Sequence, residues 1–540
     1  MFDYIFQAKI LLSLGLEPRT LGSATLRSTH YYIFIVSGGE DADTIEEAAC
    51  PAPKKKRALD ISWHKTNSSR EFAEPTPLPP LLETNPELGS LSPEEIFSLF
   101  FTDDLLDVIV NQTILYARQK NDHSFHIDKE TVKKFIGILI TSGFNTRPQE
   151  KNYWEKDPIV ACPVIADTLP RERFKQIKRY FHFVDNSSIP PNNTDKMFKL
   201  RPLLNTLRDK YNQFGQFFQN LCVDEQMIPY FGNHSCKQFI HGKPVRFGYK
   251  VWMLCSHNGY CFNFDIYCGK ETTKSTGLCK SSQVVIDLLS VIDNPHCHRL
   301  YMYFDNLFNS YELLEELSRK GIQACGTARE NRFSLKNAST TPDLHKKPRG
   351  SMEEVKSGNI SLVRWKDNKV VTFASNYVGA YPADNCTRRI KGQKERATVP
   401  RPRSANAYNK NMGGVDLLDK QIGLYRIRLT SKKWYWRIIN NFIEVSLHNA
   451  WRVHQQVDGE LSFLAFLREV ATSWMKSQTV NSNRTGPSHK PQESIRRTGR
   501  HYISKGSQRR CRVCKKNSKF SCDRCEVPLH IECFAEYHEC

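Results

Sequence analysis

The apolar residues of the first ordered stretch recur at helical spacing. At 92–95 the chain reads Ser-Pro-Glu-Glu, in which serine as N-cap, proline at the first helical position and glutamate at the third form a capping box. The apolar side chains that follow at this spacing are Phe97, Phe100, Phe101, Leu105 and Ile109. Further helices are predicted over 129–141 and 171–181. The stretch therefore predicts a helical bundle with a basic outer face.

From about residue 220 the pattern changes to strands. Three strands are predicted, at 221–230, 246–255 and 260–268, and the last two meet at the Asn258-Gly259 turn. The elements predicted next are a helix at 282–292, a strand at 299–304, a helix at 310–320 and a strand at 323–327. A meander of three strands followed by helix, strand, helix and strand is the element order of an RNase H-like domain.

Three acidic motifs coincide with this order. Asp224 lies on the first strand and Asp305 follows the fourth, where an RNase H-like site places its carboxylates. Asp416 and Asp419 come much later, three residues apart at the start of a helix after Gly413-Gly414, a spacing that points both to one side. Carboxylates brought together in this way can hold a pair of divalent metals that activate water or a 3′-hydroxyl against a phosphodiester.

The charge of the chain favours a polyanionic substrate. In 540 residues, 77 Lys and Arg outnumber 57 Asp and Glu, which gives a formal net charge of +20. The phosphodiester that suits such a chain is nucleic acid. No apolar run reaches the roughly 18–20 residues that cross a bilayer, so no membrane contact is expected.

The first part of the chain, up to about residue 87, shows no periodic pattern, and we expect it to be mostly disordered. It contains a compact basic cluster beside proline, Lys54, Lys55, Lys56 and Arg57. Such a cluster is either a solvated charge run or a nuclear-import signal, and we favour import, hence a nuclear protein.

The end of the chain has the spacing of zinc ligands. Six of the 17 cysteines fall between 511 and 540, together with two histidines. We expect two interleaved tetrahedral zinc sites. One set is Cys511, Cys514, His530 and Cys533; the other is Cys522, Cys525, His538 and Cys540. The basic run before them favours contact with DNA, whereas the ligand order also resembles PHD fingers and RING ubiquitin ligases, whose final Cys-x2-Cys is absent.

These patterns predict an α/β chain: an RNase H-like catalytic core with a β-rich insertion, flanked by a helical region and a small C-terminal zinc-binding domain. The insertion is inferred from an alternating hairpin at 360–365 and 370–375. The expected divisions are a disordered arm at 1–87, helices at 88–220, the core at 221–330, the insertion at 331–405, the last acidic motif at 406–425, helices at 426–480, a basic linker at 481–508 and the zinc finger at 509–540.

Taken in order, the motifs resemble those of the piggyBac family of DNA transposases and their domesticated relatives, over roughly residues 91–540. The resemblance rests on Arg173-Phe174-x4-Arg179-x2-His182-Phe183-x-Asp185-Asn186, Val223-Asp224-Glu225-Gln226, Arg246-Phe247-Gly248-Tyr249-Lys250, Phe304-Asp305-Asn306, Gly326-Thr327-Ala328-Arg329, Asn411-Met412-Gly413-Gly414-Val415-Asp416-x2-Asp419 and Trp434-Tyr435-Trp436, followed by the zinc module.

The resemblance implies a cut-and-paste transposase. Its catalytic triad would be Asp224, Asp305 and Asp416, with Asp419 as an additional acid, and two Mg²⁺ ions would be bridged by Asp224. Family members bind terminal inverted repeats of double-stranded DNA as homodimers and integrate at TTAA. The helices before and after the core would form the dimerisation and DNA-binding part, and the cysteine-rich tail would recognise transposon ends.

Two features leave alternatives open. Lys420 stands where many relatives have glutamine, and the first ninety residues replace an acidic arm, so the chain is either a transposase or a nuclear DNA-binding protein that no longer catalyses transposition. A zinc-dependent ubiquitin ligase or chromatin reader is the weakest hypothesis. Trp434 and Trp436 either stack on an unpaired base or pack in a helical core against Phe442.

Overall fold

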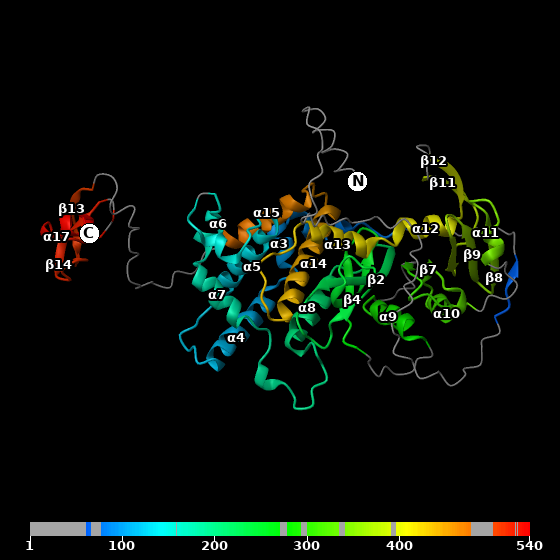
Figure 1. The fold of residues 1–540 in the computed structure, drawn as a ribbon, viewed down its shortest axis with the longest axis horizontal. Helices are drawn as coiled ribbons and strands as arrows, with labels where there is room; N and C mark the ends of the chain where they lie inside the picture. Colours follow the sequence, from blue (N-terminus) through cyan, green and yellow to red (C-terminus); the bar gives the residue numbers. More distant parts are fainter. Residues whose placement is uncertain are drawn as a thin grey trace, which may run out of the picture. The chain divides into compact units, whose positions relative to one another are not determined.

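The computed structural model describes residues 61–65, 77–157, 159–269, 278–292, 300–333, 341–389, 396–476, 501–523, 525 and 527–539. The chain divides into two compact units, Met1–Gln478 and Thr479–Cys540 (Figure 1). Across the described residues, no helix has both the length and the apolar character needed to cross a membrane. The basic cluster at Lys54–Arg57 lies outside the described residues.

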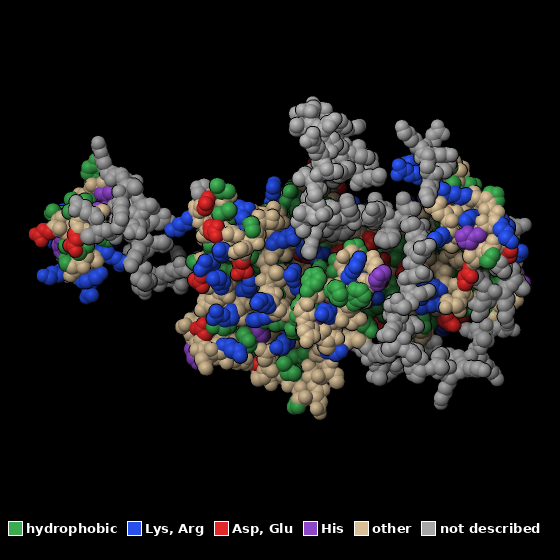
Figure 2. Space-filling view, in the orientation of Figure 1, with side chains coloured by type: hydrophobic (Ala, Val, Ile, Leu, Met, Phe, Trp, Pro, Cys, Tyr) green, Lys and Arg blue, Asp and Glu red, His purple; other side chains and the backbone are tan. Residues whose placement is uncertain are grey.

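Helices from two distant stretches of the chain build one bundle in the first unit. The earlier helices are α2 (Leu81–Thr84), α3 (Pro93–Ser98), α4 (Asp103–Gln119), α5 (Lys129–Phe144), α6 (Pro163–Thr168), α7 (Arg171–Tyr180) and α8 (Arg201–Tyr211), and the later ones are α14 (Tyr435–Gln456) and α15 (Phe463–Lys476). A Cβ on Gly137 of α5 would lie 2.8 Å from Met475 Cγ, so glycine permits α15 to pack closely there. Many Lys and Arg side chains, with some Asp and Glu among them, lie on the surface over α4, α5 and α7 (Figure 2).

The predicted capping box starts α3 as expected. The Ser92 hydroxyl accepts a hydrogen bond from the Glu95 N–H, and the Glu95 carboxylate accepts one from the Ser92 N–H at 2.8 Å. The apolar residues at helical spacing after it are buried, among them Phe97, Phe100 and Ile109.

The remainder of the first unit is built on one large sheet. Its strands are β1 (His64–Lys65), β2 (Asn220–Pro229), β3 (Gln238–Phe239), β4 (Phe247–Ser256), β5 (Cys261–Ile266), β6 (Tyr301–Phe304), β7 (Gln323–Thr327), β8 (Met352–Ser357), β9 (Ile360–Lys366) and β10 (Val370–Ser375). The order is β1-β8-β9-β10-β7-β6-β2-β4-β3, with β5 paired to β4. A separate hairpin consists of β11 (Asp384–Arg389) and β12 (Arg396–Arg401).

The predicted meander and the elements after it are confirmed. β2, β4 and β5 are antiparallel neighbours, whereas β6 pairs parallel to β2 and β7 pairs parallel to β6. The connecting helices are α9 (Lys280–Leu289) and α10 (Tyr311–Arg319). Parallel strands need such crossover helices, so helical and strand periodicities alternate in this stretch.

The structure adds detail to two of the expected divisions. Within 331–405, β10 pairs antiparallel to β7 and so extends the same sheet through β9 and β8, whereas β11 and β12 form the separate hairpin. The arm expected to be disordered up to residue 87 contains β1, which pairs with β8, and α2. Trp63 beside β1 is buried, and its indole N–H donates to the Phe333 carbonyl at 3.0 Å.

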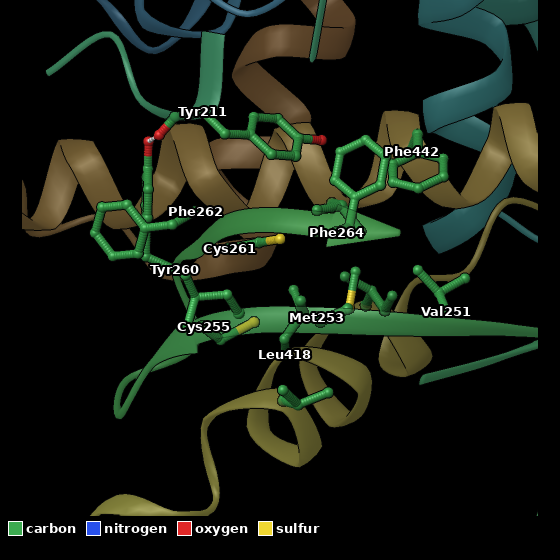
Figure 3. Packing of buried hydrophobic residues seen from close by; sticks show 14 of the residues in the cluster. Tyr211, Val251, Met253, Cys255, Tyr260, Cys261, Phe262, Phe264, Leu418 and Phe442 are labelled. Carbon is green, nitrogen blue, oxygen red and sulfur yellow. Dashed lines mark hydrogen bonds between the residues drawn. The ribbon is translucent and has the colours of Figure 1, made fainter. Parts of the chain in front are cut away.

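Two further helices follow the added strands. They are α12 (Arg403–Asn411) and α13 (Gly414–Leu424), and α13 packs against β2 and β4. Figure 3 shows Phe264 of β5 and Phe442 of α14 above β4, and Leu418 of α13 below it. The two phenylalanine rings have centroids 4.2 Å apart. The last acidic motif is thus fixed to the sheet by buried apolar side chains.

The second unit is small. It consists of β13 (Ile503–Arg510), β14 (Asn517–Cys522) and α17 (Glu532–Glu539). Its buried apolar residues are Cys511, Cys522, Cys525, Val527 and Leu529. A core of this size cannot by itself stabilise a domain, so bound metal is expected to contribute.

Candidate catalytic acids and metal centres

The sheet register places two of the predicted acids next to each other. Val223 of β2 lies opposite Phe304 of the parallel strand β6, so Asp224 and Asp305 occupy the next positions of neighbouring strands. The N–H of Leu307 donates to Asp305 Oδ1 at 2.9 Å and orients that carboxylate. Both side chains are half-buried, on two interior strands of the sheet where β6 ends.

Gly414 brings the third acid to the same place. A Cβ on this residue would lie 2.0 Å from the Ser256 carbonyl oxygen and 2.7 Å from Cys222 Sγ. Only glycine therefore lets the first turn of α13 approach β2 and β4 so closely. Asp416 follows two residues later, and its negative charge acts on Asp224.

The electrostatics of the acids reflect their crowding. Burial raises the pKa of Asp224 well above its usual value, and the charges of Glu225, Asp305 and Asp416 raise it further. Burial and the charge of Glu225 raise the pKa of Asp305 to about 6. Asp416 is exposed to solvent, but partial desolvation of its carboxyl still raises its pKa. Burial and the repulsion between like charges thus both favour the neutral forms of these acids.

Sequence reasoning missed one cation in this site, Lys243. Its Nζ lies 2.9 Å from Glu225 Oε1. Burial opposes ionisation of Glu225, but Lys243 and Lys250 outweigh it and lower the pKa of that carboxyl. Lys243 comes from the loop between β3 and β4, and no local pattern marks it as part of the acidic site.

The acidic site fits divalent cations of the Mg²⁺ type by its chemistry. It offers only oxygen donors, which hard cations prefer. Glu225 Oε2 is buried and has no hydrogen-bond partner among the described residues, so it has acceptor capacity left over. Within those residues, the carboxylate oxygens do not converge to the 4.8 Å that the cysteine–histidine groups below reach, as expected for like charges that repel one another.

Asp419 has different surroundings from the other acids. Its Oδ1 accepts hydrogen bonds from Arg426 at 3.1 Å and from Gln226 Nε2 at 3.2 Å. Asn441 of α14 donates to the other end of Gln226 at 2.8 Å. Asp419 was predicted as an additional catalytic acid; the structure makes it part of a polar network that joins α13, β2 and α14.

This network gives a stability prediction. Arg426 balances both Asp419 and the buried Glu444, whose Oε2 lies 4.0 Å from the guanidinium. Arg426→Ala should lower the free energy of unfolding by about 3 kcal/mol, because two largely buried carboxylates lose their counter-charge. All 8 tryptophans lie in the first unit, so their fluorescence in denaturant reports its unfolding. Lys420→Ala, which removes an exposed charge from α13, serves as the control; equal midpoints for the two variants would contradict the role given to Arg426.

The raised pKa of Asp305 predicts a pH dependence. Between the usual aspartate pKa of about 3.9 and its pKa of about 6 here, the folded chain holds a proton that the unfolded chain releases. The associated stability is present at low pH and is lost as pH rises through about 6. Asp305→Asn should therefore stabilise the metal-free acidic site by about 2 kcal/mol at pH 7.5 and hardly at all at pH 4. Thermal unfolding without Mg²⁺ at both pH values measures the difference in stability between Asp305→Asn and the wild type. A difference that is the same at pH 4 and pH 7.5 would contradict the raised pKa of Asp305.

The second unit gathers two groups of metal-ligand atoms. In each group these atoms all lie within 4.8 Å of one another. The first contains Cys511, Cys514, His530 and Cys533, as predicted from the spacing. The His530 ring is oriented by its Nε2, which lies 2.9 Å from the Asn517 carbonyl oxygen and leaves Nδ1 toward Cys514 at 3.2 Å. Holding the second ring nitrogen in this way is typical of histidines that bind metals.

The second group differs from the predicted one by a single residue. It contains Cys522, Cys525, His538 and His501, whereas Cys540, the predicted fourth member, lies outside the described residues. His501 Nδ1 is 3.3 Å from Cys522 Sγ, and His538 Nδ1 is held 2.8 Å from the Phe534 carbonyl oxygen. His501 precedes the first cysteine by ten residues, so the Cys-x2-Cys spacing gave no reason to include it. Both groups have the donor atoms that zinc prefers.

The two tryptophans proposed as stacking residues have different environments. Trp436 is fully buried against Phe135 and Phe181, at centroid distances of 5.9 and 5.3 Å, so it belongs to the helical core. Trp434 is half-buried and stacks on His234 at 4.3 Å. A stacking role is thus excluded by burial for Trp436.

Comparison with known proteins gives consistent results. Residues 92–451 match the family described as Transposase IS4. The chain is 34% identical to human PiggyBac transposable element-derived protein 3 over 83% of its own length and 76% of the relative's. It is 31% identical to human PiggyBac transposable element-derived protein 2 over 93% of its own length and 85% of the relative's.

Among solved structures, a cryo-EM structure of the piggyBac transposase synaptic complex with hairpin DNA matches with a TM-score of 0.61. The match covers 83% of this chain and 96% of that one at 20% identity, which shows a common fold. The order of the strands, the position of the acids on them and the similarity to the two human relatives therefore all indicate the same protein family. The chain belongs to the piggyBac transposable element-derived protein family and carries an IS4-type DDE transposase domain.

Proposed function

We propose that this protein binds double-stranded DNA at specific terminal repeats, cleaves it in a metal-dependent reaction and joins the ends at TTAA sites. The observation that carries the proposal is that β2, the end of β6 and the start of α13 bring three acids close enough for the charges of Asp305 and Asp416 to act on Asp224. We take the sheet around them to be an RNase H-like catalytic core. Their raised pKa values are expected of carboxylates arranged to receive divalent cations.

Asp224, Asp305 and Asp416 would hold two Mg²⁺ ions. When bound, such ions polarise the phosphodiester and lower the pKa of a coordinated water or 3′-hydroxyl. The chain itself contributes the fixed orientation of Asp305 by the Leu307 N–H and the placement of Asp416 by Gly414. Lys243, whose Nζ lies 2.9 Å from Glu225 Oε1, would add a positive charge beside the acids that suits contact with a DNA phosphate.

The zinc module would contribute to DNA recognition. Its strand β13 is largely exposed and carries Lys505, Arg509 and Arg510. Cations on a rigid strand suit contact with the phosphate backbone.

We further propose that the protein acts as a homodimer, which sedimentation of the purified chain tests. We also propose that it enters the nucleus through the Lys54–Arg57 cluster, which imaging of a tagged chain with that cluster replaced tests.

The proposal is tested by Mg²⁺-dependent nicking and strand transfer on terminal-repeat DNA, with Asp305→Ala beside the wild type. Product from the wild type alone supports it. A chain that binds terminal repeats but never cleaves them would instead be a nuclear DNA-binding protein that has kept the transposase fold.

A further inference from the structure

The segment that carries Lys243 also carries an exposed aromatic surface. Phe231, Phe239 and Phe247 have 76%, 55% and 41% of their surface exposed. Phe239 and Phe247 are cross-strand partners of β3 and β4 with ring centroids 4.8 Å apart, and Phe231 lies 6.5 Å from Phe247. Single exposed apolar side chains are common on proteins, but three large exposed rings clustered around Phe247 indicate a binding surface.

The charge around these rings is of one sign. Residues 230–250 contain no Asp or Glu. Their cations are Lys237, Lys243, Arg246 and Lys250. Figure 2 shows hydrophobic side chains gathered with Lys, Arg and His side chains over the region of β2 and β4. Lys243 and Lys250 lie beside the acids of the site, whereas a protein partner with an apolar face would leave Lys237 and Arg246 unbalanced. A nucleic acid strand offers phosphates for them.

The same segment connects the rings to the acids. Lys243 Nζ lies 2.9 Å from Glu225 Oε1. Lys250 interacts electrostatically with the same acidic site, with Glu225 most strongly and then with Asp305 and Asp224. Phe247 is next to Gly248, which pairs with Pro229 of β2. From Pro229 to Asp224 the strand runs five residues, so the rings lie about 17 Å along β2 from the acid. A DNA strand that leaves the acids along this segment would therefore meet the cations first and the rings a few nucleotides later.

We propose that Phe231, Phe239 and Phe247 stack against unpaired bases of a DNA strand whose backbone is held by Lys237 and Arg246. The inference rests on the proposed function and adds a subsite to it. A duplex hides the faces of its bases, so exposed rings select a strand whose bases are free to stack. The surface would thus hold the single-stranded end that a cut produces.

The test compares the affinity of the full chain for two duplexes of the same sequence, one blunt and one extended by six unpaired thymines, by fluorescence anisotropy without Mg²⁺. Phe247→Leu keeps an apolar side chain but removes the ring, and Phe247→Trp keeps a ring. The wild type and Phe247→Trp should prefer the extended duplex, and Phe247→Leu should lose about tenfold of that preference. Ile159→Ala, which truncates the exposed side chain of Ile159 in the helical region, should behave as the wild type.

The outcomes separate this inference from the function on which it rests. If the wild type and Phe247→Leu bind both duplexes equally, the stacking subsite is refuted while DNA binding stands. If no variant binds either duplex, the proposed function fails first. If Phe247→Leu changes only the sedimentation of the protein, the rings contact a second copy of the chain and the inference is wrong.

Discussion

Removing zinc is expected to unfold residues 501–539 while the first unit stays folded. Five small or medium side chains form the only apolar core of the described part of this unit, and it cannot offset the conformational entropy of about forty residues. Structural zinc in modules of this kind contributes roughly 10–16 kcal/mol of binding free energy, which here would supply most of the folding free energy. Chelation should release two zinc ions per chain and make the second unit sensitive to protease.

Single substitutions sharpen the expectation. Cys522→Ser should release one zinc ion and lower the affinity for terminal-repeat DNA, whereas Cys279→Ser, at an exposed cysteine of the first unit, should change neither. Tryptophan fluorescence should be the same in both variants. A second unit that keeps its protease resistance after chelation would refute the zinc assignment.

The same assay decides which residue completes the second site. The structure places His501 beside Cys522, Cys525 and His538, whereas the spacing alone favours Cys540. His501→Ala should therefore reduce the bound zinc from two ions to one, and Cys540→Ser should leave both. The reverse result would restore the ligand set predicted from the sequence.

Replacing Asp305 by alanine is expected to abolish Mg²⁺-dependent cleavage of terminal-repeat DNA. The Asp305 carboxylate is oriented by a hydrogen bond from the Leu307 N–H, and it lies next to Asp224, at the end of the neighbouring strand β6. Loss of one of the three carboxylates that we propose to hold Mg²⁺ would remove several kcal/mol of transition-state stabilisation, a factor of roughly 10³ or more in rate. Asp287→Ala removes an exposed aspartate from α9 and should leave the rate unchanged.

Affinity for DNA provides the internal control for this experiment. Because Asp305→Ala removes a negative charge from the site, the variant should bind DNA at least as tightly as the wild type while failing to cut it. A variant that cuts at the wild-type rate would exclude Asp305 from the chemistry. If the Asp305→Ala variant neither binds DNA nor folds, Asp305→Asn takes its place in the experiment, because asparagine keeps the shape of the side chain.

The order of the strands could be predicted from the sequence because each strand alternates or stays apolar over several residues. That pattern locates the strands along the chain, and the order of elements in an RNase H-like domain then predicts that Asp224 and Asp305 are neighbours, as the β2–β6 pairing shows. The pairing of β10 with β7 could not be predicted, because alternation marks a strand but not the edge on which it pairs. β1 has two residues, too few for any periodicity to appear.

The surroundings of the acids were harder to predict than the acids themselves. Lys243 reaches Glu225 from a loop, and Asp419 turns to Arg426 although it is only three residues from Asp416. Both contacts depend on how elements pack, which the spacing of residues does not record. His501 was missed for the same reason: its partners come from β14 and α17, which only folding brings to it.

The most direct test of the central claim is to map the products that the full chain forms from a terminal-repeat duplex flanked by TTAA in the presence of Mg²⁺. We predict cleavage at the border of the repeat and joining of its 3′-hydroxyl at a TTAA site, both absent with Asp305→Ala. The absence of any Mg²⁺-dependent product from the wild type, or equal product from the variant, would contradict the claim that Asp224, Asp305 and Asp416 form a catalytic metal site.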